Sequence, residues 1–170
     1  PEQILCSIGG KHSCYLAVAA LVNEWDEVLI PAPYWVSYPP MVDLVGGTPV
    51  ILPTSTESDL KITPEQLKEA ITPKTKMLIL NSPSNPSGAV YTKDELAALA
   101  DVLIGTNVWI VSDEIYEHLI YEGEHVSILN AAPELKDQTI ITNGVAKAYA
   151  MTGWRVGYSA GPAEVIKQMS

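Results

Sequence analysis

Residues 76–81 read Lys-Met-Leu-Ile-Leu-Asn, and residues 108–113 read Val-Trp-Ile-Val-Ser-Asp. Both runs are short, apolar for most of their length, and end on a polar residue. Strands that are buried on both faces of a parallel sheet have this pattern, whereas strands with one solvated face alternate between apolar and polar residues. The two runs therefore predict buried strands of an α/β protein.

Five further runs share this character, and they are separated by longer segments rich in Ala and Leu. The runs are Ile4 to Ser7, Glu27 to Pro31, Pro49 to Pro53, Thr139 to Asn143 and Arg155 to Ala160. Helices are expected from about Ser13 to Asn23, after the N-cap pattern that starts at Thr63-Pro64, and after the capping box Thr92 to Glu95. The fold class predicted is α/β: one domain over residues 1–170, a three-layer α/β/α sandwich with a mostly parallel seven-stranded sheet.

Composition narrows the possible partners. The chain has 170 residues, 47% of them hydrophobic and 18% charged, with a formal net charge of −10. Such a chain folds, and its acidity argues against a nucleic acid or an anionic membrane as partner. Two cysteines, Cys6 and Cys14, make no disulfide framework, and no spacing of Cys or His indicates a metal.

No apolar run is long enough to cross a bilayer, and no signal-peptide pattern opens the chain. A cytoplasmic location is therefore the expectation. Because the chain opens on Pro1, it is expected to be a piece of a longer protein, which leaves import into an organelle open.

Polar, Gly-rich or aromatic residues follow several of the predicted strands, where the ligands of α/β sheets bind. They are Gly9-Gly10-Lys11, Pro33-Tyr34-Trp35, Asn81 to Gly88, Ser112 to Tyr116, and Asn143 to Lys147. Each has an ordinary explanation by itself: a tight turn, a core aromatic, a turn-rich loop or a surface lysine. Asp113 has no such ordinary explanation, because a carboxylate at the end of a buried strand needs a hydrogen-bond donor or a cation.

The combination points to a pyridoxal phosphate site. A lysine supplies a Schiff base to the aldehyde, an acid keeps the pyridine nitrogen protonated, and a Gly-rich helix start with an arginine binds the phosphate. A dinucleotide site is disfavoured, because the stretch Gly9 to Ser13 lacks the G-x-G-x-x-G spacing and no acid ends the second strand.

Three long motifs carry a family resemblance that covers essentially the whole chain. They are the stretches Asn81 to Gly88, Ser112 to Glu117, and Asn143 to Tyr158. In this order they resemble the class I aminotransferases, in the aspartate and prephenate branch. The chain is thus similar to the large, cofactor-binding domain of fold-type I enzymes.

The resemblance assigns a role to each candidate residue. Lys147 resembles the Schiff-base lysine that also moves the substrate Cα proton, and Asp113 resembles the partner of the pyridine nitrogen. Tyr116 and Asn85 look like the donors to the cofactor's phenolic oxygen, and Trp35 looks like the aromatic that stacks on the ring. The backbone of Gly10 and Lys11, together with the guanidinium of Arg155, resembles the phosphate cradle of the family. Lys11 also looks like the group that meets the distal carboxylate of aspartate or glutamate, in a substrate site with Trp35 and Asn85.

The chain departs from the family pattern at several positions. Ala146 or Gly144 stands where many relatives have a hydroxyl, and Val145 stands where many have Phe. Trp25 stands where a glycine with a left-handed backbone is usual. These departures, together with the absence of any Phe among 170 residues, favour an edited or reconstructed sequence.

The resemblance also implies parts that these residues do not include. They are an N-terminal arm, a C-terminal small domain with the arginine that clamps the substrate α-carboxylate, and the partner of a homodimer. Three functions follow as alternatives: transamination between an acidic amino acid and a 2-oxo acid, cofactor binding with little turnover, or a less controlled fold-type I reaction such as that of a C–S lyase.

Overall fold

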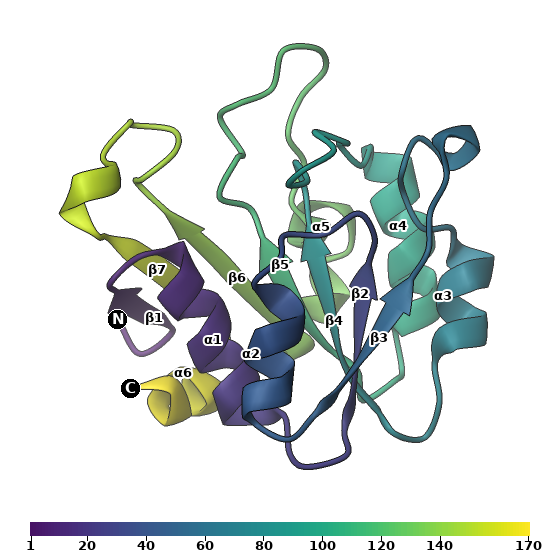
Figure 1. The fold of residues 1–170 in the computed structure, drawn as a ribbon, viewed down its shortest axis with the longest axis horizontal. Coiled ribbons are helices and arrows are strands. Elements are labelled where there is room, and N and C mark those ends of the chain that lie inside the picture. The colour runs from purple at the N-terminus through teal and green to yellow at the C-terminus, as the bar shows by residue number, and fades with distance from the viewer.

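The computed structural model describes residues 1–170 and has a single seven-stranded sheet at its centre (Figure 1). The strand order across the sheet is β1-β7-β6-β5-β4-β2-β3. The strands are β1 (Ile4–Ser7), β2 (Glu27–Pro31), β3 (Thr48–Leu52), β4 (Thr75–Asn81), β5 (Trp109–Asp113), β6 (Thr139–Gly144) and β7 (Gly157–Ala160). All seven predicted strands are therefore confirmed, with shifts at their ends.

The sheet is mostly parallel, as predicted, and β7 is its one reversed strand. It pairs antiparallel with both β1 and β6, whereas the β2, β3, β4, β5 and β6 neighbours pair in parallel. The start of β7 therefore lies at the same edge as the ends of the other strands. For this reason Arg155, which precedes β7 instead of opening it, reaches the edge where β4, β5 and β6 end.

Helices cover both faces of the sheet and complete the predicted three layers (Figure 1). One face packs against α1 (Gly10–Leu21), α2 (Tyr38–Leu44) and α6 (Ala163–Met169), and the other packs against α3 (Pro64–Ala70), α4 (Lys93–Leu103) and α5 (Ile128–Ala131). Short 3₁₀ turns span Thr56–Ser58, Pro133–Gln138 and Thr152–Trp154. None of the helices has the length and apolarity needed to cross a bilayer.

Alternate residues of the central strands enter two separate cores. Met77 and Ile79 of β4 pack under α1 and α2, whereas Leu78 and Leu80 pack under α3 and α4. All four are at most 1% exposed. Burial on both faces explains why the apolar run in the sequence is continuous, and it fixes the register of the strand.

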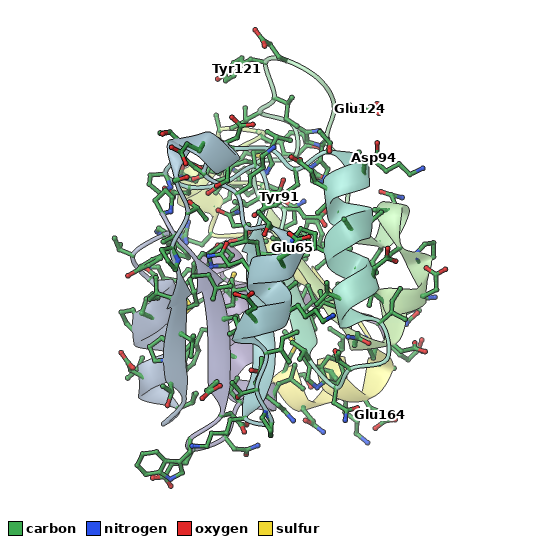
Figure 2. All side chains as sticks on the ribbon, turned by 90° about the vertical axis from the view of Figure 1, so that its right-hand side faces the viewer. Glu65, Tyr91, Asp94, Tyr121, Glu124 and Glu164 are labelled. Carbon is green, nitrogen blue, oxygen red and sulfur yellow. The ribbon has the colours of Figure 1, made fainter.

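The helix starts confirm the capping patterns. The Thr63 hydroxyl accepts from Gln66 N at 3.2 Å, and Thr92 forms a reciprocal capping box with Glu95. Figure 2 shows Asp94 in the first turn of α4, above Tyr91. Helix α1 differs from its predicted range, because it begins three residues earlier, at Gly10, and ends at Leu21.

One turn carries backbone strain. Trp25, between α1 and β2, has a φ of 72° and a side chain that is 71% exposed. A left-handed backbone costs a residue with a Cβ about 1–2 kcal/mol, and the exposed ring recovers little of it by packing. The sequence expectation of a left-handed residue at this position is confirmed.

We expect Trp25→Gly to stabilise the chain by about 0.5–1 kcal/mol, because glycine removes the strain but adds freedom to the unfolded state. Thermal unfolding should show a rise of about 2–4 °C per kcal/mol. Trp25→Ala is the matched control and should change little, since it keeps the Cβ. Equal gains in the two variants would contradict the strain assigned to this turn.

Candidate active site

The site lies at the edge where three parallel strands end. Asn81 of β4 is in register with Asp113 of β5, which is in register with Thr142 of β6. A cleft at this edge is lined by Gly10, Lys11, Trp35, Tyr38, Asn81, Asn85, Asp113, Ile115, Tyr116 and Lys147. The fold thus brings every candidate residue to one cleft except Arg155, which lies beside it.

Asp113 is the buried acid of the cleft, with 5% of its surface exposed. Its Oδ2 accepts from the Tyr38 hydroxyl at 2.6 Å and from the Cys14 thiol at 3.6 Å, and its Oδ1 accepts from Ile115 N at 3.3 Å. Burial raises the pKa of Asp113, and the bond from Tyr38 opposes that rise. No lysine, arginine or histidine pairs with it. Such a carboxylate favours a ligand that brings a positive charge.

Tyr38 and Cys14 keep their protons and so act as donors. Burial, and then the charge of Asp113, raises the pKa of both side chains well above their usual values. Neither residue was predicted to belong to the site. Tyr38 is the first residue of α2, a helix that was not predicted either. The only sequence signal for Tyr38 is its place three residues after Trp35 and directly before two prolines.

Asn81 holds the loop that presents Asn85. Its Nδ2 donates to the Asp113 carbonyl at 2.8 Å, and its Oδ1 accepts from Asn85 N at 2.7 Å. The Asn85 amide in turn donates to the Tyr116 hydroxyl at 3.4 Å. Two predicted donors from different loops therefore meet at one point of the cleft, and Asn81 is the residue that positions one of them.

Lys147 follows β6 in a turn that is not helical. Ala150 N donates to the Lys147 carbonyl at 3.1 Å, and Ala150 has a φ of 51°. The Lys147 ammonium lies 5.7 Å from the centroid of the Tyr116 ring. No acid pairs with this amine. It is thus an amine that lines the same cleft as a buried acid and forms no salt bridge.

The start of α1 forms an anion cradle with Arg155. Gly9 has a φ of 115°, and a Cβ there would come within 2.5 Å of Arg155 Nη2, so only glycine allows the guanidinium to lie this close. A Cβ on Gly157 would lie 2.6 Å from Gly10 N. No side chain caps the helix start. Free helix N–H groups beside a guanidinium are well suited to a phosphate.

Trp35 and Lys11 lie together at another side of the cleft. The Lys11 ammonium is 5.1 Å from the Trp35 ring centroid, and the Trp35 ring meets the Tyr38 ring edge-on at 5.4 Å. Tyr38 therefore connects the aromatic ring at the cleft to the buried acid. A larger hollow of about 540 Å³ adjoins the cleft and shares Asn85 and Tyr116 with it.

Comparison with known proteins agrees with this geometry. The sequence profile of the family described as aminotransferase class I and II matches residues 1–170. An aspartate aminotransferase of Geobacillus stearothermophilus is 55% identical over 171 residues, covering 100% of this chain and 44% of that protein. An aspartate/prephenate aminotransferase of Cereibacter sphaeroides is 54% identical, covering 99% and 43%. The chain thus spans less than half the length of these curated relatives.

Solved structures give the same result. The aspartate aminotransferase from Rhizobium meliloti superposes with a TM-score of 0.97 at 44% identity, covering 99% of this chain and 42% of that one. The aspartate aminotransferase from Thermus thermophilus, solved with maleate, superposes with a TM-score of 0.94 at 49% identity, covering 99% and 44%.

Asp113 should destabilise the cofactor-free chain at neutral pH. Folding raises the pKa of Asp113. Its contribution to the free energy of unfolding is therefore fully present below the pKa of the unfolded chain, about 3.9, and is lost as the pH rises through the pKa of the folded chain. We expect Asp113→Asn to raise the melting temperature at pH 7 by about 2–4 °C and to change it little near pH 3. Asp137→Asn, at an exposed position, is the control. A lower melting temperature for Asp113→Asn at pH 7 would refute this account.

Proposed function

The chain belongs to the class I and II aminotransferases, and we propose that it is the pyridoxal phosphate-binding part of an enzyme that transfers an amino group between an acidic amino acid and a 2-oxo acid. One observation carries the proposal. A lysine without an ionic partner, a buried acid without a cation and an uncapped helix start beside an arginine surround the same strand ends.

The donor set fits pyridoxal phosphate group by group. Lys147 would hold the aldehyde carbon, and Asp113 would hold the protonated ring nitrogen, for which its burial without a cation is the supporting observation. The N–H groups of Gly10 and Lys11, with the Arg155 guanidinium, would hold the phosphate, for which the missing Cβ of Gly9 is the supporting observation.

The remaining residues complete that fit. Asn85 and Tyr116 would both donate to the phenolic oxygen, and their mutual contact supports this role. The Trp35 ring would lie against the cofactor ring. When bound, the cofactor supplies an electron sink for the bonds of the substrate Cα.

The chain's own residues perform the other tasks. The Lys147 amine would remove and return the proton at the substrate Cα. Asp113 would keep a proton on the ring nitrogen of the cofactor, and Tyr38 stabilises the charge of Asp113 by donating to it. Lys11 meets the distal carboxylate of the substrate, which selects acidic amino acids over neutral ones.

A homodimer in the cytoplasm is part of the proposal for the whole protein. Beside the phosphate cradle, a hollow is lined by Ile8, Lys11, His12, Tyr15, Met41, Leu44 and Arg155. Ile8 and Leu44 are 68% and 75% exposed, and exposed apolar side chains grouped around an active site support a covering partner subunit.

Cofactor binding without useful turnover is the second candidate, and one observation favours it. Arg155 is the single arginine of the 170 residues, and we assign it to the phosphate cradle, so these residues hold no second guanidinium to orient a substrate α-carboxylate. Orientation supplies much of an enzyme's rate. Conversion of bound cofactor to its amine form by aspartate, with release of the 2-oxo acid, would decide for transamination over binding alone.

We expect pyridoxal phosphate to form a near-visible absorbance band with the chain and, after borohydride treatment, a covalent adduct on Lys147. Lys147→Ala should abolish both signals, because the one other amine that lines the cleft, that of Lys11, lies over the Trp35 ring instead. Lys167→Ala, at an exposed position of α6, should leave both unchanged. Peptide mapping by mass spectrometry identifies the modified residue. An adduct of full yield in Lys147→Ala would sink the assignment.

Lys11→Gln should weaken the binding of aspartate to the cofactor-loaded chain about 5- to 10-fold, since a Coulomb attraction of roughly 1 kcal/mol or more at contact distance is lost. Alanine, which has no distal carboxylate, should bind the variant and the parent alike. Absorbance titration with each amino acid measures the two affinities, and Lys11→Arg, which keeps the charge, is the control. Equal weakening for both amino acids would mean that Lys11 does not select the substrate.

A further inference from the structure

The two glutamates that flank Tyr116 in the sequence point away from the cleft. Asp113 and Tyr116 line the cleft, whereas Glu114 and Glu117 do not. Glu114 is nevertheless only 4% exposed, which is unusual for a carboxylate that pairs with no lysine or arginine. Glu114 therefore contributes to the site through its contacts with the chain and not through contact with a ligand.

Glu114 binds the far end of the segment that it begins. Its Oε1 accepts from Ser112 Oγ at 2.8 Å and from Ser127 Oγ at 2.7 Å. Its Oε2 lies 3.0 Å from His125 Nε2. Ser127 is also the N-cap of α5. One buried carboxylate thus joins the end of β5 to the start of α5 and closes the segment 114–127 into a loop.

Glu117 fixes the near end of the same segment. Its Oε1 accepts from Asn143 Nδ2 at 2.7 Å, and the Asn143 Oδ1 accepts from Gly144 N at 2.7 Å. The backbone N–H of Glu114 donates to the Thr142 carbonyl at 3.0 Å. Tyr116 therefore sits on a turn that is tied to β6, the strand that leads to Lys147.

The middle of the segment has few anchors of its own. Tyr121, at its tip, is 94% exposed and stands clear of the sheet in Figure 2. The position of Tyr116 relative to Asn85 and Lys147 therefore depends on the ends of the segment. We propose that Glu114 and His125 are positioning residues, which hold the segment so that Tyr116 presents its hydroxyl at the cleft. This inference rests on the proposed function of Tyr116.

The anchor depends on pH. The hydrogen bond that His125 makes to the Glu114 carboxylate raises the pKa of His125 against the opposing effect of burial, and the charges of Glu114 and Glu117 add to the rise. These two carboxylates and the His125 ring lie within 4.8 Å of one another. The ion pair therefore contributes fully below about pH 6.5 and weakens as the pH rises through the raised value. The His125 Nδ1 is buried without a partner, so no second bond holds the ring.

Amide hydrogen exchange on the cofactor-free chain tests the anchor directly. The relevant amides are those of Glu117 and Leu119, which close the turn around Tyr116. His125→Ala should speed their exchange roughly tenfold at pH 6, after correction for the intrinsic rate. His125→Gln should preserve the protection and remove its pH dependence, because Gln donates without titrating. Unchanged exchange in His125→Ala would overturn the inference.

The cofactor-loaded chain tests the link to Tyr116. Tyr116→Phe should move the pH midpoint of the near-visible band upward by about one unit, since a donor to the phenolic oxygen is lost. His125→Ala should move it in the same direction, His125→Gln should restore it, and the double variant should match Tyr116→Phe alone. Additive shifts would refute a positioning role. If the parent chain forms no band, the proposed function fails, while hydrogen exchange still decides whether the anchor exists.

Discussion

A buried carboxylate at the end of β5 is the constraint on which the site depends. Asp113 is removed from water by the same close packing that makes β4 and β5 apolar on both faces, and it pairs with no positive side chain. Tyr38, Cys14 and a backbone N–H compensate for part of that burial. The rest of the cost of burying the charge is not compensated within the chain. It lowers the stability of the ligand-free fold, and it favours the binding of a cationic ligand at Asp113.

The strands were predictable because burial on both faces leaves a continuous apolar run, and all seven appear within two residues of their expected ends. Short helices carry no such signal. Helix α2 has seven residues and two prolines, and α5 has four residues, so neither contains enough turns for a periodic pattern. Tyr38 was missed together with α2. By contrast, the prediction that residues after several strands meet at one edge of the sheet agrees with the cleft, because a parallel topology brings strand ends together independently of the loop conformations.

The anchoring contacts were beyond the reach of the sequence for a different reason. Glu114 meets His125 and Ser127 across a loop whose path no periodicity fixes, and all three residue types are ordinary on a protein surface. The division of labour in the stretch from Asp113 to Glu117 is nevertheless regular. Asp113, Ile115 and Tyr116 line the cleft, whereas Glu114 and Glu117 bind the surrounding structure, so one short motif supplies both the chemistry and its support.

The reversal of β7 has a consequence for how the site can change. Lys147 follows β6 and Arg155 precedes β7, so a single connection, with seven residues between the two, joins the amine to the anion cradle. Since β6 and β7 are fixed in register, the length of this connection sets the span between the two ends of any molecule held by both. An inserted or deleted residue there would alter that span. The length of this connection and the distance between the two binding groups of the ligand would therefore have to change together.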